Sequence, residues 1–110
     1  MSKPIDPQTS LEAIHNAGPR LAAAKAERVY LEEYRKSLKA LLMSASKQTS
    51  AAMQERDAYA DPSYTAHLMA LRVAVEKEET LRWRMVVSQA AIEVWRSQEA
   101  SNRAIDKAAA

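Results

Sequence analysis

Basic residues recur in the last third of the chain at spacings that suit contact with a polyanion. Arg82, Arg96 and Arg103 fall in one seven-residue row of a helix, Lys107 follows one turn later, and Arg84 lies in the same region. A row of cations on one helix can follow a phosphate backbone, because phosphate contacts dominate the affinity of proteins for nucleic acids. The net charge is only +2, so the placement of these residues matters more than the total charge.

The neighbouring aromatic residues allow two interpretations. Trp83, Trp95 or a tyrosine can stack on an unpaired base, whereas a tryptophan inside an apolar zone usually packs against other side chains or another subunit. The arginines also have a structural alternative, since they can pair with Glu27, Glu32 or Glu33 across a hairpin or between subunits. The sequence leaves both alternatives open.

The chain lacks the groups on which most catalytic sites depend. It contains no cysteine and a single glycine, so it offers neither a thiol nucleophile nor a glycine-rich loop for a nucleotide. His15 and His67 lie on separate predicted helices without a serine motif beside them. We expect His67 to be a packed or half-exposed residue near a turn. We therefore predict no catalytic residues, no enzymatic activity and no cofactor.

The cluster of Glu76, Glu78 and Glu79 is the candidate for acid–base chemistry or a di-iron site. Metal sites in helical bundles use a Glu-x-x-His pair, and no histidine follows these glutamates at that spacing. We expect instead a solvated face on which Glu78 pairs with Arg82, four residues later. No metal site is predicted.

The composition is that of long helices. The chain has 110 residues, one glycine, four prolines and no phenylalanine, and it is rich in helix-forming residues. We expect an all-α protein in which residues 1–110 form a single helical domain, a long antiparallel hairpin preceded by a short helix. An extended hairpin of this length buries little surface within itself, so assembly into a homo-oligomeric bundle or ring is expected.

Proline and glycine set the predicted helix boundaries. Asp6 caps and Pro7 opens a short helix over about residues 7–17, and Gly18-Pro19 ends it. A second helix covers about residues 19–60, with no glycine or further proline inside it. Asp61-Pro62 repeats the start signal and opens a third helix over about residues 62–107.

The turn at Asp61 predicts how the two long helices pair. A short connection between helices of equal length favours an antiparallel arrangement. Folding about Asp61 places Tyr34 near Ser88, so we expect the two apolar zones, Val29–Ala45 and Leu81–Trp95, to lie side by side.

The zone from Leu81 to Trp95 predicts assembly. Between Met85 and Trp95 the only charged residue is Glu93, so a helix here is apolar on nearly every side. One partner helix from the same chain covers only one flank, and the rest indicates other subunits or a target. The predicted oligomer interface comprises Leu81, Met85, Val86, Val87, Ile92, Val94 and Trp95.

The sequence also predicts a location. The first ten residues contain no apolar core of signal-peptide length, and the apolar runs are far shorter than the ~20 residues that span a bilayer. Basic residues are not segregated opposite one apolar face, which disfavours binding to a membrane surface. We expect a cytoplasmic protein without membrane contact.

The end of the chain resembles a known family. The long hairpin, residues Tyr59–Tyr64 at the turn and the closing segment with Asn102 and Arg103 resemble the small recombination mediator proteins of phages, the UvsY-like group. The resemblance covers about the last two thirds of the chain. Members commonly follow the arginine with glycine and an aromatic residue, whereas this chain has Ala104 and Ile105. Only Asn102 and Arg103 are therefore carried over as DNA-contacting residues.

The resemblance implies a ring-forming helical protein of a phage-infected or bacterial cell. Such a protein binds single-stranded DNA and helps to load a recombinase or annealing protein in place of a single-strand binding protein. Two other functions stay open: an accessory protein or inhibitor that acts on a host protein without touching nucleic acid, and a purely structural oligomer. The predicted nucleic-acid-binding residues are Arg82, Arg84, Arg96, Asn102, Arg103 and Lys107.

Overall fold

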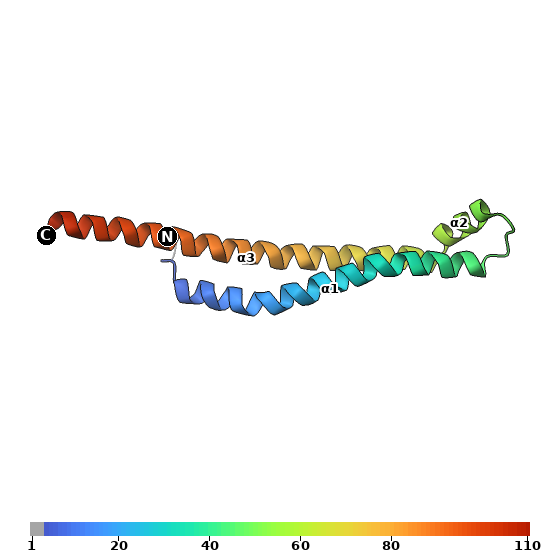
Figure 1. Cartoon of the computed structure of the whole chain (residues 1–110), viewed down its shortest axis with the longest axis horizontal. Helices are drawn as coiled ribbons and strands as arrows, with labels where there is room; N and C mark the ends of the chain where they lie inside the picture. Colours follow the sequence, from blue (N-terminus) through green and yellow to red (C-terminus); the bar gives the residue numbers. More distant parts are fainter. Residues whose placement is uncertain (1–3) are drawn as a thin grey trace. The chain divides into compact units, whose positions relative to one another are not determined.

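A computed structural model describes residues 4–110, and all regular secondary structure among them is helical. The helices are α1 (Pro7–Ala45), α2 (Ala51–Ala60) and α3 (Pro62–Ala109), labelled in Figure 1. The predicted all-α fold is confirmed. The chain divides into two compact units, one formed by the residues up to Leu21 together with Thr80–Ala110, the other by Ala22–Glu79.

Two aspartates mark helix starts where the sequence predicts them, before Pro7 and before Pro62. The Thr9 hydroxyl donates to Asp6 Oδ2 at 2.8 Å, and the Ser63 hydroxyl donates to Asp61 Oδ1 at 2.6 Å. These hydrogen bonds stabilise the carboxylate form, so the Thr9 hydroxyl lowers the pKa of Asp6 and the Ser63 hydroxyl lowers the pKa of Asp61. Each aspartate precedes a proline at the first helical position, where no intrahelical N–H is needed.

The predicted break at Gly18-Pro19 is wrong, because α1 runs through both residues. Ile14, Ala17 and Leu21 are partly buried at helical spacing on either side of Pro19, whereas Pro19 itself is exposed. Continuous packing of that face offsets the hydrogen bond that proline removes. Gly18 keeps a helical backbone, since no glycine among residues 4–110 has a positive φ. The short helix over 7–17 is therefore the first part of α1.

The predicted continuous helix over 19–60 is also wrong, because residues 46–50 separate α1 from α2. The Ser50 hydroxyl accepts the Met53 N–H at 3.2 Å and caps α2. The Ser46 hydroxyl donates to the Asp57 carboxylate at 2.6 Å. Serine side chains compete with the helical backbone for hydrogen bonds, so two serines four residues apart offer the chain an alternative to a straight helix.

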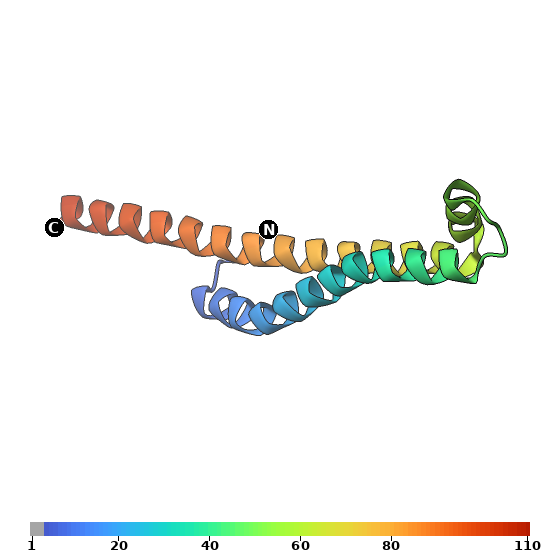
Figure 2. The ribbon, with the colours of Figure 1, turned by 45° about the vertical axis from the view of Figure 1, so that its right-hand side comes forward.

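Within the unit Ala22–Glu79, α2 turns away from the direction of α1 (Figure 2). Ala58 of α2 is fully buried. Lys39 Nζ of α1 lies 4.9 Å from the centroid of the Tyr59 ring and 3.6 Å from Glu55 Oε1. Contact with the Tyr59 side chain, followed by the charge of Glu55, raises the pKa of Lys39. Lys39 therefore connects α2 to α1.

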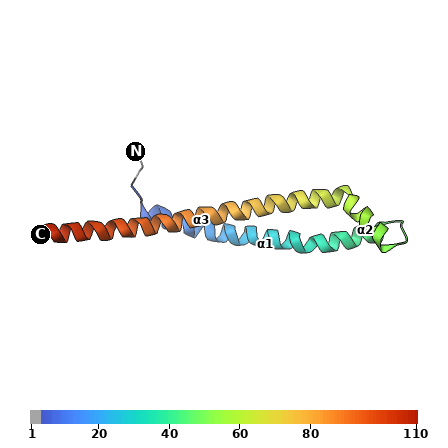
Figure 3. The same ribbon diagram turned by 90° about the horizontal axis from the view of Figure 1, so that it is seen from above.

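The same unit pairs α1 with α3 in an antiparallel arrangement, seen from above in Figure 3. The buried ring of His67 lies 5.5 Å from the Tyr34 ring, and its Nε2 is 2.6 Å from the carbonyl oxygen of Leu31. The expectation that His67 is packed is confirmed. The predicted neighbour of Tyr34, Ser88, is wrong, and so is the predicted pairing of Val29–Ala45 with Leu81–Trp95. The reason is that residues 46–60 do not extend α1.

The face of α3 that packs against α1 is marked by a spacing of three and four residues. This spacing is that of a coiled-coil seam, in which every a and d position faces the partner helix. Buried or partly buried side chains along α3 follow it at Tyr64, His67, Leu71, Ala74, Glu78, Leu81, Met85, Ser88, Ile92 and Trp95.

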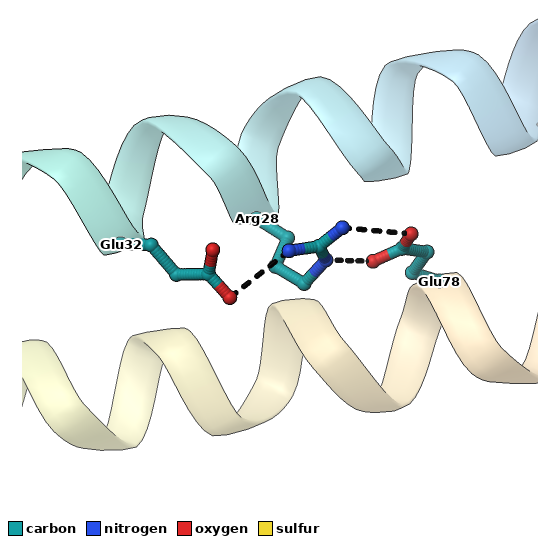
Figure 4. Close-up of polar contacts among 3 residues, drawn as sticks. All are labelled: Arg28, Glu32 and Glu78. Carbon is teal, nitrogen blue, oxygen red and sulfur yellow. Dashed lines mark hydrogen bonds and ion pairs between the residues drawn. The ribbon is translucent and has the colours of Figure 1, made fainter.

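One charged pair lies inside this seam. Glu78 of α3 has 2% of its side chain exposed and receives hydrogen bonds from Arg28 of α1 through Nε and, at 3.3 Å, through Nη2 (Figure 4). The Nη1 of Arg28 donates to Glu32 at 2.9 Å. Buried alanines, Ala24 and Ala74, lie one turn away on each helix and leave room for the two long side chains. Glu78, followed by Glu32, raises the pKa of Arg28.

The prediction that Glu78 belongs to a solvated face is wrong. A buried ion pair adds little net stability, because the cost of removing both charges from water offsets most of their attraction. A polar pair in an apolar seam instead specifies which residues face each other. Arg28 and Glu78 therefore fix the alignment of α1 against α3 in this unit.

Replacing one partner of the pair should lower the free energy of unfolding more than replacing both. We expect Glu78→Leu to lower the free energy of unfolding by about 2 kcal/mol, the value of a hydrogen-bonded charge, and Arg28→Leu to lower it further because the buried carboxylate loses its bidentate partner. The double variant should return close to the wild type. Urea denaturation of the four proteins measures this, and additive losses in the double variant would contradict a direct pairing.

The break between α1 and α2 predicts an unusual tolerance for proline. Ala51 is the first residue of α2 and follows Ser50 in an extended conformation, with φ −92 and ψ 147, which suits a following proline. Ala51→Pro should leave helicity and stability unchanged or slightly improved. In the control Gln54→Pro, the substitution removes the 3.0 Å bond from Gln54 N to Ser50 O and should cost about 3 kcal/mol. Circular dichroism during urea denaturation separates the two, and equal damage by both would favour a continuous helix.

Candidate nucleic-acid and assembly surfaces

The predicted nucleic-acid-binding residues all lie in the unit that contains Thr80–Ala110. The seven-residue spacing of Arg82, Arg96 and Arg103 on α3 brings them to one row of the helix, beside the seam. Arg84 is two residues from Arg82, so it lies about 160° away around the helix. The structure thus joins three of the arginines in a row and separates Arg84 from them. The exposed members of the set are Arg82, Arg84, Arg96, Asn102, Arg103 and Lys107.

The arginines of the row differ in their present contacts. Arg96 donates to Glu93 at 3.2 Å, and both side chains are exposed, so this pair is weak and easily exchanged for another anion. Arg103 forms no ion pair with any residue from 4 to 110. The suggested acidic partners Glu32 and Glu33 are instead paired with residues of α1 itself.

The end of α3 is exposed on all sides. Every side chain from Ser101 to Ala110 is exposed, although the helix continues to Ala109. This segment carries Asn102, Arg103 and Lys107, so these polar side chains are accessible to a partner.

The predicted oligomer interface falls on two faces of α3. Leu81, which is 7% exposed, and the partly buried Met85, Ile92 and Trp95 occupy the seam. Val86, Val87 and Val94 lie outside the seam and are exposed. The sequence predicts a single surface over the zone Leu81–Trp95, whereas only the exposed part of that zone is open to another molecule.

The exposed part of the zone Leu81–Trp95 forms a second apolar stripe. Trp83, Val87, Ala90 and Val94 follow one another at spacings of four, three and four residues on α3, which is again the spacing of a packing face. Trp83 is 64% exposed and Val87 is 65% exposed. Clustered large apolar side chains in water mark an interaction surface.

A small cavity brings together basic residues that the sequence does not connect. It measures about 200 Å³ and lies between α1 and α3 within the unit that contains both stretches. Arg84 was a predicted site residue, but Asn16, Arg20 and Ser88 were missed, because their meeting depends on how the helices align. The cavity is lined by Ala13, Asn16, Ala17, Arg20, Leu81, Arg84 and Ser88.

Other kinds of site find no support in residues 4–110. No group of three His, Cys, Asp or Glu side chains within this range is placed to hold a metal ion. No helix in the same range is long and apolar enough to cross a membrane. Comparison with known proteins gave no match, whether with family models, curated proteins or solved structures.

A carboxylate introduced by substitution should have different effects on the two faces of α3. Val87→Asp should abolish assembly but leave the helical content of the subunit intact, because Val87 is exposed in the single chain. Leu81→Asp should unfold much of the chain, since an unpaired carboxylate in an apolar seam costs ~3 kcal/mol or more. Light scattering at micromolar concentration gives the mass, and circular dichroism gives the helicity. A wild-type protein of monomeric mass would contradict assembly through the outer stripe.

Proposed function

We propose that the chain is an accessory protein of DNA recombination that assembles into a homo-oligomer and binds single-stranded DNA without sequence preference. The observation that carries this proposal is the exposed end of α3, where Arg103 continues the row of Arg82 and Arg96, and Asn102 and Lys107 are exposed near it. The resemblance to UvsY-like mediators supports a role in loading a recombinase or annealing protein in place of a single-strand binding protein.

Charge and copy number together set the expected affinity. With a net charge of +2 and acidic residues such as Glu93, Glu99 and Asp106 between the basic ones, a single subunit holds a polyanion weakly. Several copies on one strand multiply a few contacts through effective concentration. Phosphate contacts release counterions, so binding should weaken steeply as salt rises.

The apolar stripe of Trp83, Val87, Ala90 and Val94 supplies the contact between copies in this proposal. It leaves the row of Arg82, Arg96 and Arg103 on a different side of α3, since its four residues lie one, five, six and two positions from the nearest arginine of the row, which is about 100° to 160° around the helix. Assembly and strand binding can therefore use separate faces of one helix.

The same apolar stripe favours a second candidate function. A protein-binding accessory or inhibitor would place the stripe against a host protein and use the basic residues only as a polar rim. This candidate predicts a protein whose stripe is essential and whose arginines on the row tolerate replacement. The two candidates are separated by a binding measurement with DNA.

Loss of one cation at the helix end should weaken binding to every sequence alike. We expect Arg103→Ala to reduce affinity for labelled oligo-dT and mixed-sequence oligonucleotides several-fold, and to make the dependence of affinity on salt shallower by about one unit for each phosphate that Arg103 neutralises. The matched control Arg72→Ala removes the same charge from an exposed position of α3 in the other unit. Fluorescence anisotropy at low and moderate salt measures both.

Two outcomes would count against the proposal. An oligomer of unchanged mass that binds no oligonucleotide at low salt would replace strand binding by the protein-binding candidate. Equal losses for Arg103→Ala and Arg72→Ala would show that net charge, rather than the end of α3, attracts the strand.

A further inference from the structure

We propose that the cavity lined by Arg20 and Arg84 is a phosphate-binding subsite, which takes one backbone phosphate of a bound strand. The identity of the strand rests on the proposed function, whereas the cavity's chemistry does not. The cavity lies within the unit that holds residues up to Leu21 and Thr80–Ala110.

Two arginines from different helices, Arg20 of α1 and Arg84 of α3, line this one cavity. Neither Arg20 nor Arg84 forms an ion pair with any residue between 4 and 110. Like charges that share a small site repel each other, and an anion between them turns the repulsion into attraction. No acidic residue lines the cavity, so no carboxylate of the lining competes for the place.

The remaining lining residues suit an oxyanion. A guanidinium presents its N–H groups as a planar fork that matches two oxygens of a phosphate. Asn16 and Ser88 add an amide and a hydroxyl, which are neutral donors for the other oxygens. The alanines Ala13 and Ala17 are small and keep the space open.

The size of the cavity also suits a phosphate group. Its volume of about 200 Å³ is several times the ~30 Å³ share of one water molecule. A phosphate group can therefore enter together with some of its water. Full dehydration of the anion is not required, which lowers the cost of binding.

The subsite adds a direction to the proposed strand path. Arg84 lies about 160° around α3 from the row of Arg82, Arg96 and Arg103. A strand that places one phosphate in the cavity and others on the row therefore cannot follow a single face of α3. The cavity and the row therefore hold different phosphates, and the effects of replacing them should be additive.

The test observes the arginine side chains directly by NMR. Inorganic phosphate, and separately oligo-dT, is titrated into the intact protein while the Nε–Hε signals are followed, with equal ionic strength of chloride as reference. We expect shifts at Arg20 and Arg84 and none at Arg72, with Arg20→Gln removing the shift at Arg84. Arg20→Gln should also weaken oligo-dT binding several-fold, whereas Arg72→Gln should not. Circular dichroism confirms that each variant keeps its helicity.

The outcomes separate the subsite from the proposed function. Oligo-dT binding that is unaffected by Arg20→Gln, with no phosphate shift at Arg84, overturns the subsite and leaves strand binding in place. Phosphate shifts without any binding of oligo-dT support an anion site for free phosphate and overturn strand binding. Shifts of equal size at Arg20, Arg84 and Arg72 would indicate general screening and overturn the subsite.

Discussion

The buried ion pair between Arg28 and Glu78 is the constraint on which the alignment of the helices depends. An apolar heptad seam can slip by seven residues and still bury similar side chains, so leucines and alanines alone specify it weakly. Glu78, with 2% of its side chain exposed, tolerates burial only where a cation meets it. The small side chains of Ala24 and Ala74 leave space for the ion pair. The pair contributes specificity more than net stability, because desolvation of both charges offsets most of their attraction.

The sequence predicts the helical fold and the starts of α1 and α3, because aspartate followed by proline is a local signal that needs no tertiary contact. The predicted boundaries are wrong at Pro19, where packing of the seam outweighs a local breaker, and at residues 46–50, where serine side chains end α1 although the stretch from Arg20 to Ala60 contains neither glycine nor proline. The predicted alignment of α1 against α3 is therefore wrong. The expected neighbour of Tyr34 is Ser88 and the observed one is His67, a difference of 88 − 67 = 21 residues, or three heptads. Both alignments present the same a and d faces, so periodicity cannot separate them.

Some candidate surfaces follow from the residue spacing within one helix, and others follow only from contacts between helices. The row of Arg82, Arg96 and Arg103 is visible in the sequence because the spacing of one helix places it. The division of the zone Leu81–Trp95 into a buried and an exposed face is not visible in the sequence. A helix that is apolar on nearly every side gives no sign of which side its own chain covers. Once Leu81 and Ile92 lie in the seam, Trp83, Val87 and Val94 are left on the outside. A contact on these outer residues would therefore leave the row of Arg82, Arg96 and Arg103 uncovered.

The charge of the cavity at Arg20 depends strongly on the alignment of α1 against α3. A slip of α1 by one heptad against α3 would bring Glu27 or Ala13 to the place of Arg20. Glu27 would supply a carboxylate for Arg84 and remove the reason for an anion to enter, while Ala13 would leave Arg84 with half of the positive charge. Arg84 shares the cavity with a second arginine in the observed alignment and in neither of these two. The chemistry of the cavity therefore depends on which residue of α1 faces Arg84, and this is a property of the helix alignment rather than of either helix alone.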